Sequence, residues 1–152
     1  MTITTPIKRH RNDSQIRLMH IVNCLALSGT EYNVIKLLNN LDRKQFSPSV
    51  IDLQPTLSDA RAHVAKDIDV FELPKGEGFQ PRLIVKMAKL FRQLKIDIIH
   101  SHNWTTFLYS VLAARLASVP LIIHGEHGRD TADYERNPKQ LRMRKFLASI
   151  CD

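Results

Sequence analysis

Histidine and acidic side chains follow two apolar stretches in the second half of the sequence. His100 and His102 stand in the segment DIIHSHNW, and His124, Glu126 and His127 stand in the segment LIIHGEHGRD. Imidazole groups bind transition metals, exchange protons near neutral pH and hydrogen-bond to sugar hydroxyls or phosphates. If the two apolar stretches are neighbouring strands, the sequence predicts that these side chains meet at the rim of one pocket.

A metal site would use His100 and His102, because a spacing of two directs both side chains to one face of a strand. His127 or Glu126 would complete the ligand set. The sequence contains no H-E-x-x-H pattern, and histidines at strand ends more often hydrogen-bond to backbone or substrate. We therefore expect no metal and no cofactor.

The segment LSGTEYNVIKLL places Gly29 directly before a helical pattern. The free N–H groups and the dipole of a helix start favour an anion such as a phosphate. Ser28 and Glu31 also have the S-x-x-E spacing of a capping box, which satisfies the same donors internally. Both interpretations stay open, but the absence of G-x-G-x-x-G and of a P-loop pattern disfavours an ordinary dinucleotide or P-loop site.

The single tryptophan, Trp104, lies between a strand pattern and a helix pattern. In one interpretation Asn103 or Thr105 caps the helix while Trp104 packs against the edge of the sheet. In the other, Trp104 contacts a sugar or a lipid. The sequence alone does not choose between them.

Strand and helix patterns alternate after a flexible basic tail at residues 1–15. Apolar strands separated by helices form a parallel sheet that is covered on both faces. The predicted fold is therefore a doubly wound, Rossmann-like α/β domain at 16–152, with ligands beyond the carboxyl ends of its strands. We expect strands at 16–22, 49–53, 68–74, 96–100 and 119–126, and helices at 30–41, 58–66, 81–95, 104–117 and 138–151.

The net charge of +7 indicates an anionic partner, which could be nucleic acid, anionic lipid or a phosphorylated small molecule. Aromatic residues make up 7% and are not interleaved with the basic ones, which argues against nucleic acid. The basic helix at 138–151 fits either a solvated face or contact with an anionic membrane. Two distant cysteines and no signal segment favour a cytoplasmic location.

Several segments together resemble the N-terminal half of family 4-type retaining glycosyltransferases, which have the two-domain GT-B fold. Among these, the chain looks most like the sugar transferases associated with exosortase and exopolysaccharide systems. HSHNW and HGEHGRD are the specific matches, and the helical segments are generic. The resemblance runs through IRLMHIVNCLALSGTEYNVIKLLNNLDRKQF, LPKGEGFQ, DIIHSHNW, LAARLASVPLIIHGEHGRD and RKFLASICD, over about residues 16–152.

The resemblance implies that a hexose moves from a nucleotide sugar to a lipid-linked or polysaccharide acceptor. It implies that His127 is catalytic and orients donor and acceptor, and that Glu31 matches the acid of the family's Gly-Gly-x-Glu turn. This chain has Ser28 where the family usually has the first glycine. The substrate-binding residues implied are Ser28, Gly29, Thr30, His102, Asn103, Trp104, Glu126, Gly128 and Arg129.

In the family a second domain holds the nucleotide sugar, and its motifs are absent from these 152 residues. The resemblance therefore implies that the chain alone is inactive, with peripheral contact at the inner face of the membrane. A non-catalytic α/β binding module, or one subunit of a split glycosyltransferase, is the alternative.

Overall fold

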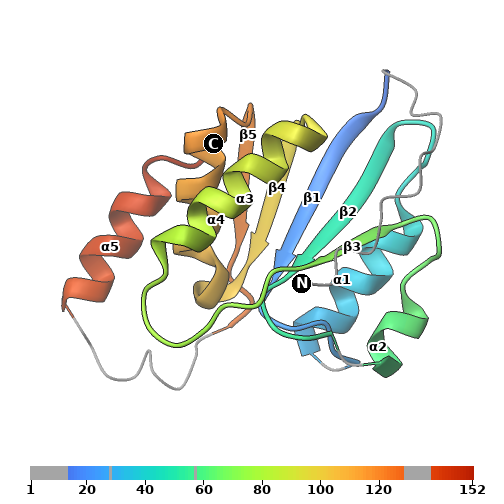
Figure 1. Cartoon of the computed structure of the whole chain (residues 1–152), viewed down its shortest axis with the longest axis horizontal. Coiled ribbons are helices and arrows are strands. Elements are labelled where there is room, and N and C mark those ends of the chain that lie inside the picture. The colour runs from blue at the N-terminus through green and yellow to red at the C-terminus, as the bar shows by residue number, and fades with distance from the viewer. Residues whose placement is uncertain (1–13, 28, 57, 129–137) are drawn as a thin grey trace.

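The computed structural model describes residues 14–27, 29–56, 58–128 and 138–152. Helices and strands alternate along this part of the chain, as the sequence predicts (Figure 1). None of the described helices has the length and apolar character needed to cross a membrane. The elements are β1 (Ile16–Val22), α1 (Gly29–Asn40), β2 (Phe46–Asp52), α2 (Ser58–His63), β3 (Asp69–Glu72), α3 (Pro81–Leu94), β4 (Ile98–His102), α4 (Asn103–Ala117), β5 (Leu121–Gly125) and α5 (Pro138–Ala148).

The strands form one sheet in the order β3-β2-β1-β4-β5, and every neighbouring pair is parallel. The chain moves outward from β1 to β2 and β3 and then returns to place β4 on the other side of β1. The strand order therefore reverses between β1 and β4. All carboxyl ends lie at one edge of the sheet, the lower edge in Figure 1, where doubly wound folds bind their ligands.

Helices cover both faces of the sheet (Figure 1). On one face, α1 and α2 pack over β1 to β3, around Val22, Leu38 and Val50. On the other face, α3, α4 and α5 enclose a larger apolar cluster that contains Met19 and Phe91. Alternate side chains of each strand therefore pack against the helices on opposite faces of the sheet, which confirms the predicted doubly wound arrangement.

The fourth strand begins two residues later than the sequence suggests. Helix α3 ends at Leu94, and its C-cap residue Lys95 adopts a left-handed backbone conformation with a φ of 51°. Ile96 and Asp97 form the turn, so the strand runs from Ile98 to His102. The prediction of a strand at 96–100 was wrong in this respect, and its consequence is that His102 lies inside the strand rather than beyond it.

Arg17 and Asp97 join the beginnings of β1 and β4. The Arg17 guanidinium donates hydrogen bonds of 2.9 and 3.1 Å to the Asp97 carboxylate, and the Arg17 backbone N–H donates a third of 2.8 Å. The Asp97 N–H donates in return to the Arg17 carbonyl at 3.0 Å. Hydrogen bonds from Arg17 hold the pKa of Asp97 below its ordinary value.

Replacement of Asp97 by Asn is expected to lower the free energy of unfolding at pH 7 by about 1 kcal/mol, because the pair is partly exposed. The lowered pKa makes this contribution complete above the unfolded-state pKa of about 3.9, and it is lost as the pH falls through the folded-state pKa. Urea unfolding of wild type and Asp97→Asn at pH 7 and pH 3 measures it. A difference that does not shrink at pH 3 would contradict a role for the carboxylate charge.

Candidate functional site

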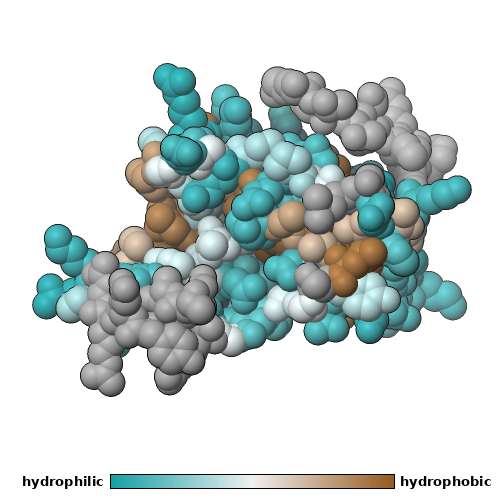
Figure 2. Space-filling view, turned by 90° about the horizontal axis from the view of Figure 1, so that it is seen from below, coloured by the Kyte–Doolittle hydropathy of each residue, from teal (hydrophilic) through white to brown (hydrophobic). Residues whose placement is uncertain are grey.

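The loops that follow β1, β4 and β5 meet at the carboxyl edge of the sheet. Figure 2 looks onto this edge, which is mostly hydrophilic with a few apolar patches. Gly29 and Thr30 begin α1, and Asn103 and Trp104 begin α4. Glu126, His127 and Gly128 follow β5. Ser28 and Arg129, which the sequence also predicts as site residues, lie outside the described residues.

Three histidines of β1 and β4 stack against one another on the sheet. His20 is the register partner of His100, and His102 follows two residues later on the same face. The ring centroids of His100 and His102 are 4.2 Å apart, and those of His20 and His102 are 5.2 Å apart with nearly parallel planes. The predicted common face of His100 and His102 is confirmed, and His20 joins them from a strand 80 residues earlier.

A chain of hydrogen bonds leads from this cluster to the surface. Nδ1 of His20 lies 2.9 Å from Nε2 of His102, and Nδ1 of His102 lies 2.9 Å from Nε2 of His127. A neutral imidazole has one donor and one acceptor nitrogen, so the donors along this chain must all point in one direction. The position of the proton on His102 therefore determines whether Nε2 of the exposed His127 donates or accepts the hydrogen bond between them.

Burial keeps the inner rings of the chain uncharged. Burial and, to a smaller extent, the charges of neighbouring imidazoles together lower the pKa of His20 to about 3 and that of His102 to about 2. The pKa of His100 is also lowered by burial. These three side chains are consequently neutral at physiological pH, and His102 positions His127 through a hydrogen bond rather than through charge.

Asn103 holds the backbone of the loop that carries His127. Its Oδ1 accepts a hydrogen bond of 3.2 Å from the His127 N–H. The prediction that Asn103 or Thr105 caps α4 was wrong: within the described chain His102 is the N-cap and makes no side-chain cap bond. The Thr106 hydroxyl donates to the His102 carbonyl instead, at 2.8 Å. Asn103 has a φ of 62°, a left-handed conformation that asparagine tolerates better than most residues.

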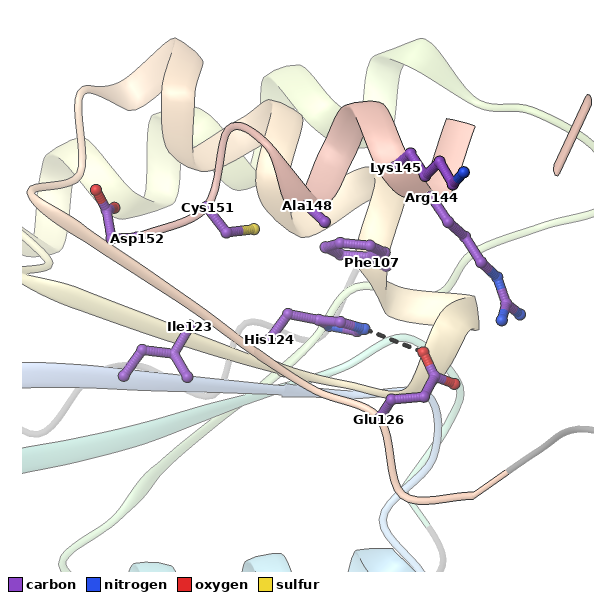
Figure 3. A pocket seen from close by; sticks show the side chains of 9 residues that line it. All are labelled: Phe107, Ile123, His124, Glu126, Arg144, Lys145, Ala148, Cys151 and Asp152. Carbon is purple, nitrogen blue, oxygen red and sulfur yellow. Dashed lines mark hydrogen bonds and ion pairs between the residues drawn. The ribbon is translucent and has the colours of Figure 1, made fainter. Parts of the chain in front are cut away.

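His124 and Glu126 lie on the opposite face of the sheet, toward α4 and α5. The His124 ring stacks on Phe107 with centroids 3.7 Å apart, and its Nδ1 lies 2.9 Å from the Ser101 hydroxyl. Its Nε2 faces Glu126 at 3.3 Å (Figure 3). Burial lowers the pKa of His124, and the Glu126 carboxylate partly offsets this. The expectation that all four histidines meet at one pocket rim is therefore wrong: His100, His102 and His127 lie together, and His124 lies apart from them on the other face.

A pocket of about 420 Å³ lies beside His124 and Glu126, between the end of β5 and α5 (Figure 3). Arg144 and Lys145 of α5 contribute positive charge to it. The Arg144 guanidinium lies 4.6 Å from the centroid of the Trp104 ring, which also makes an edge contact with Phe107. Trp104 thus packs against Phe107 of α4 and Arg144 of α5. Its packing against the edge of the sheet and its contact with a sugar or lipid both stay predictions.

Asp52, at the end of β2, holds the loop between β1 and α1. Its carboxylate accepts hydrogen bonds from the Leu25 N–H at 2.9 Å, the Thr56 hydroxyl at 2.8 Å and the Gln54 N–H at 3.1 Å. Burial raises the pKa of Asp52, although these hydrogen bonds oppose the shift. Gly29 then starts α1 with a φ of 55°, a conformation that favours glycine. The loop before α1 is thus fixed by a buried carboxylate.

Comparison with known proteins identifies the family of this chain. The sequence model described as Glycosyltransferase Family 4 matches residues 27–152. The chain belongs to glycosyltransferase family 4. It is also similar to the UDP-Gal:alpha-D-GlcNAc-diphosphoundecaprenol alpha-1,3-galactosyltransferase of Escherichia coli, with 28% identity over 125 residues, which are 76% of this chain. The chain covers only 30% of that relative's length.

Solved structures share the fold of this family 4 domain at low sequence identity. A putative UDP-N-acetylglucosamine 2-epimerase from Listeria monocytogenes matches with a TM-score of 0.62 and 19% identity, over 91% of this chain and 37% of the epimerase. A glycosyltransferase from Rickettsia africae ESF-5 matches with a TM-score of 0.57 and 18% identity, over 84% of this chain and 35% of its own. These likenesses confirm the Rossmann-like α/β fold expected from the sequence.

Two residues of the family 4 domain that position the site are not evident from the sequence alone. His20 interrupts an otherwise apolar run in IRLMHIV, and Asp52 follows a buried run in SVID. A buried polar side chain in a strand requires a partner, and that is the signal each residue carries. The partner itself becomes visible only with the strand order.

Replacement of Asp52 by Asn is expected to lower the free energy of unfolding by about 1–3 kcal/mol. Both carboxylate oxygens of Asp52 accept hydrogen bonds from backbone N–H groups. In whichever orientation the asparagine side chain takes, its NH₂ group would therefore face an N–H donor and lose that hydrogen bond. Asp42→Asn is the matched control, since Asp42 is exposed and its Oδ1 accepts from the Lys44 N–H. Chemical denaturation measures both variants, and equal losses would contradict the special role of Asp52.

Proposed function

We propose that this family 4 domain forms the acceptor side of a hexosyl-transfer site. A sugar would pass from a nucleotide donor to a lipid-linked or saccharide acceptor in the synthesis of exopolysaccharide or cell envelope. The arrangement of His127 carries the proposal. Its side chain is exposed at the carboxyl edge of the sheet, while His102 holds the ring and Asn103 holds the backbone.

His127 is the proposed catalytic residue because it combines exposure with a fixed orientation. In glycosyl transfer the bond from the anomeric carbon to the diphosphate breaks, a bond to the acceptor hydroxyl oxygen forms, and the proton of that hydroxyl passes to the departing diphosphate. An imidazole at this place hydrogen-bonds to a sugar hydroxyl as positive charge develops at the anomeric carbon. The buried neutral partners His20 and His102 keep the imidazole in one orientation before the substrates arrive.

The anionic parts of the substrates have matching features at the same edge. The N-terminus of α1, with Gly29 and Thr30, offers N–H groups and a positive dipole end to a diphosphate. Arg144 and Lys145 add charge on the α5 side. The Escherichia coli relative is named for a UDP-linked donor and a diphosphoundecaprenol-linked acceptor, and this supports a nucleotide sugar and a lipid diphosphate as the substrate classes here.

The remaining substrate-binding residues are proposed because of their positions relative to His127 and to the pocket. His102, Asn103 and Gly128 lie next to His127. Glu126 lines the pocket on the α5 side, and Trp104 contacts Phe107 and Arg144, which also line it. At these positions both side chains would contact the acceptor's sugar or lipid. Peripheral contact with the inner face of a membrane, through the basic surface of α5, is part of the same proposal.

The test is binding of a polyprenyl-diphosphate-linked N-acetylhexosamine, presented in detergent micelles, to the 152-residue chain. His127→Ala is expected to weaken binding about tenfold, the equivalent of one lost hydrogen bond of about 1.4 kcal/mol. The matched control is His63→Ala, because His63 is an exposed histidine of α2 and should leave binding unchanged. Fluorescence anisotropy of a labelled acceptor provides the measurement.

Three results would contradict the proposal. They are failure of the wild-type chain to bind the acceptor, equal affinities of wild type and His127→Ala, and equal binding of the polyprenyl diphosphate with and without its sugar. The last result would indicate an unspecific attraction between a basic protein and an anionic lipid.

A further inference from the structure

The histidine cluster on β1 and β4 has the composition of a metal site. His20, His100 and His102 each offer an imidazole nitrogen, and these three nitrogens lie within 4.8 Å of one another. The backbone fixes this grouping, because His20 and His100 are register partners on adjacent strands. His20 is 0% exposed and His102 is 3% exposed, so the cluster is built into the core and is not a chance meeting of surface side chains.

One nitrogen of this cluster lacks a partner. Among the described residues, Nε2 of His20 is buried and has no hydrogen-bond partner, although its Nδ1 contacts His102. Native proteins seldom bury an unpaired nitrogen unless a water, an ion or a ligand satisfies it. This unpaired atom is a second observation, separate from the grouping of the rings, that points to a bound species.

Gly125 of β5 lies directly against the rings of His100 and His127. A Cβ at Gly125 would lie 3.3 Å from Nε2 of His100 and 3.0 Å from Nε2 of His127. Both distances are tight, so any side chain at this position would crowd the two imidazoles. The glycine therefore lets β5 approach the two imidazoles closely.

We propose that His20, His100 and His102 bind a late first-row divalent cation, of which Zn²⁺ is the representative. Imidazole ligands favour zinc, copper and nickel, whereas Mg²⁺ and Ca²⁺ require oxygen ligands. Three imidazoles leave a tetrahedral cation one further position for water or another ligand. His127, hydrogen-bonded to His102, is available there or as an outer partner that orients the His102 ring.

The geometry requires only a modest adjustment. Zn–N bonds of about 2.0–2.1 Å in a tetrahedron set ligand nitrogens about 3.3 Å apart. Nitrogens now within 4.8 Å would therefore approach one another by about 1.5 Å at most.

The test uses the tag-free 152-residue chain after treatment with a chelator. Zn²⁺ is titrated by calorimetry, and Co²⁺ is titrated by its visible absorption. We expect one cation per chain and an absorption spectrum of a nitrogen-ligated, near-tetrahedral Co²⁺ without thiolate bands. At a hundredfold excess of Zn²⁺ over the dissociation constant, the unfolding temperature should rise by roughly 5–10 °C.

His100→Gln is the decisive variant, because His100 is only partly buried and its loss spares the core. It should weaken Zn²⁺ binding at least tenfold. Gly125→Ala is a second variant that leaves all three ligands in place and should weaken binding by crowding His100. His63→Ala is the matched control, because His63 lies on α2 outside the cluster, and it should bind as wild type does.

The proposal is overturned if the chain takes up no cation at micromolar Zn²⁺, or if His100→Gln binds as tightly as wild type. It is equally overturned if Cys24→Ser abolishes binding, since a thiolate would then be a ligand. These readouts measure cation binding and thermal stability, so their outcome is independent of whether the domain binds a sugar acceptor.

Discussion

The pairing of β1 with β4 is the constraint on which the rest of this structure depends. It joins the two halves of the chain where the strand order reverses, and the Arg17–Asp97 contact fixes its beginning. The same register carries through to the carboxyl edge, where His20 and His100 lie side by side. A shift of one residue would turn one of these rings to the other face of the sheet, so the register determines whether the cluster exists.

This strand pairing explains how an exposed histidine can keep a fixed orientation at the surface. His127 follows the last strand and is exposed, yet one of its ring nitrogens and its backbone N–H are both held. The partners of those atoms belong to β4 and to the first residue of α4, which are anchored in the core. Buried neutral groups thus fix the orientation of the exposed His127 ring. Their hydrogen bonds are strengthened by the low dielectric of the protein interior.

The sequence predicts the element order and fold class because the apolar periods are regular and the helix signals, such as Pro81 and Pro138, are strong. It misplaces β4 by two residues because Lys95 continues a helical pattern and then adopts a left-handed turn. It groups His124 with the wrong face because a shift of one position reverses a side chain's direction in a strand. His20 escapes notice because its neighbours in space lie 80 residues away, and only strand order reveals them.

The contact of Arg144 with Trp104 has a practical consequence. This chain has one tryptophan, at the start of α4, and its ring contacts Arg144 of α5, which lines the pocket shown in Figure 3. Indole fluorescence responds to nearby charge and polarity. The intrinsic emission of the protein is therefore an optical reporter of this one corner of the molecule, sensitive to any displacement of α5 relative to α4 and free of signal from other tryptophans.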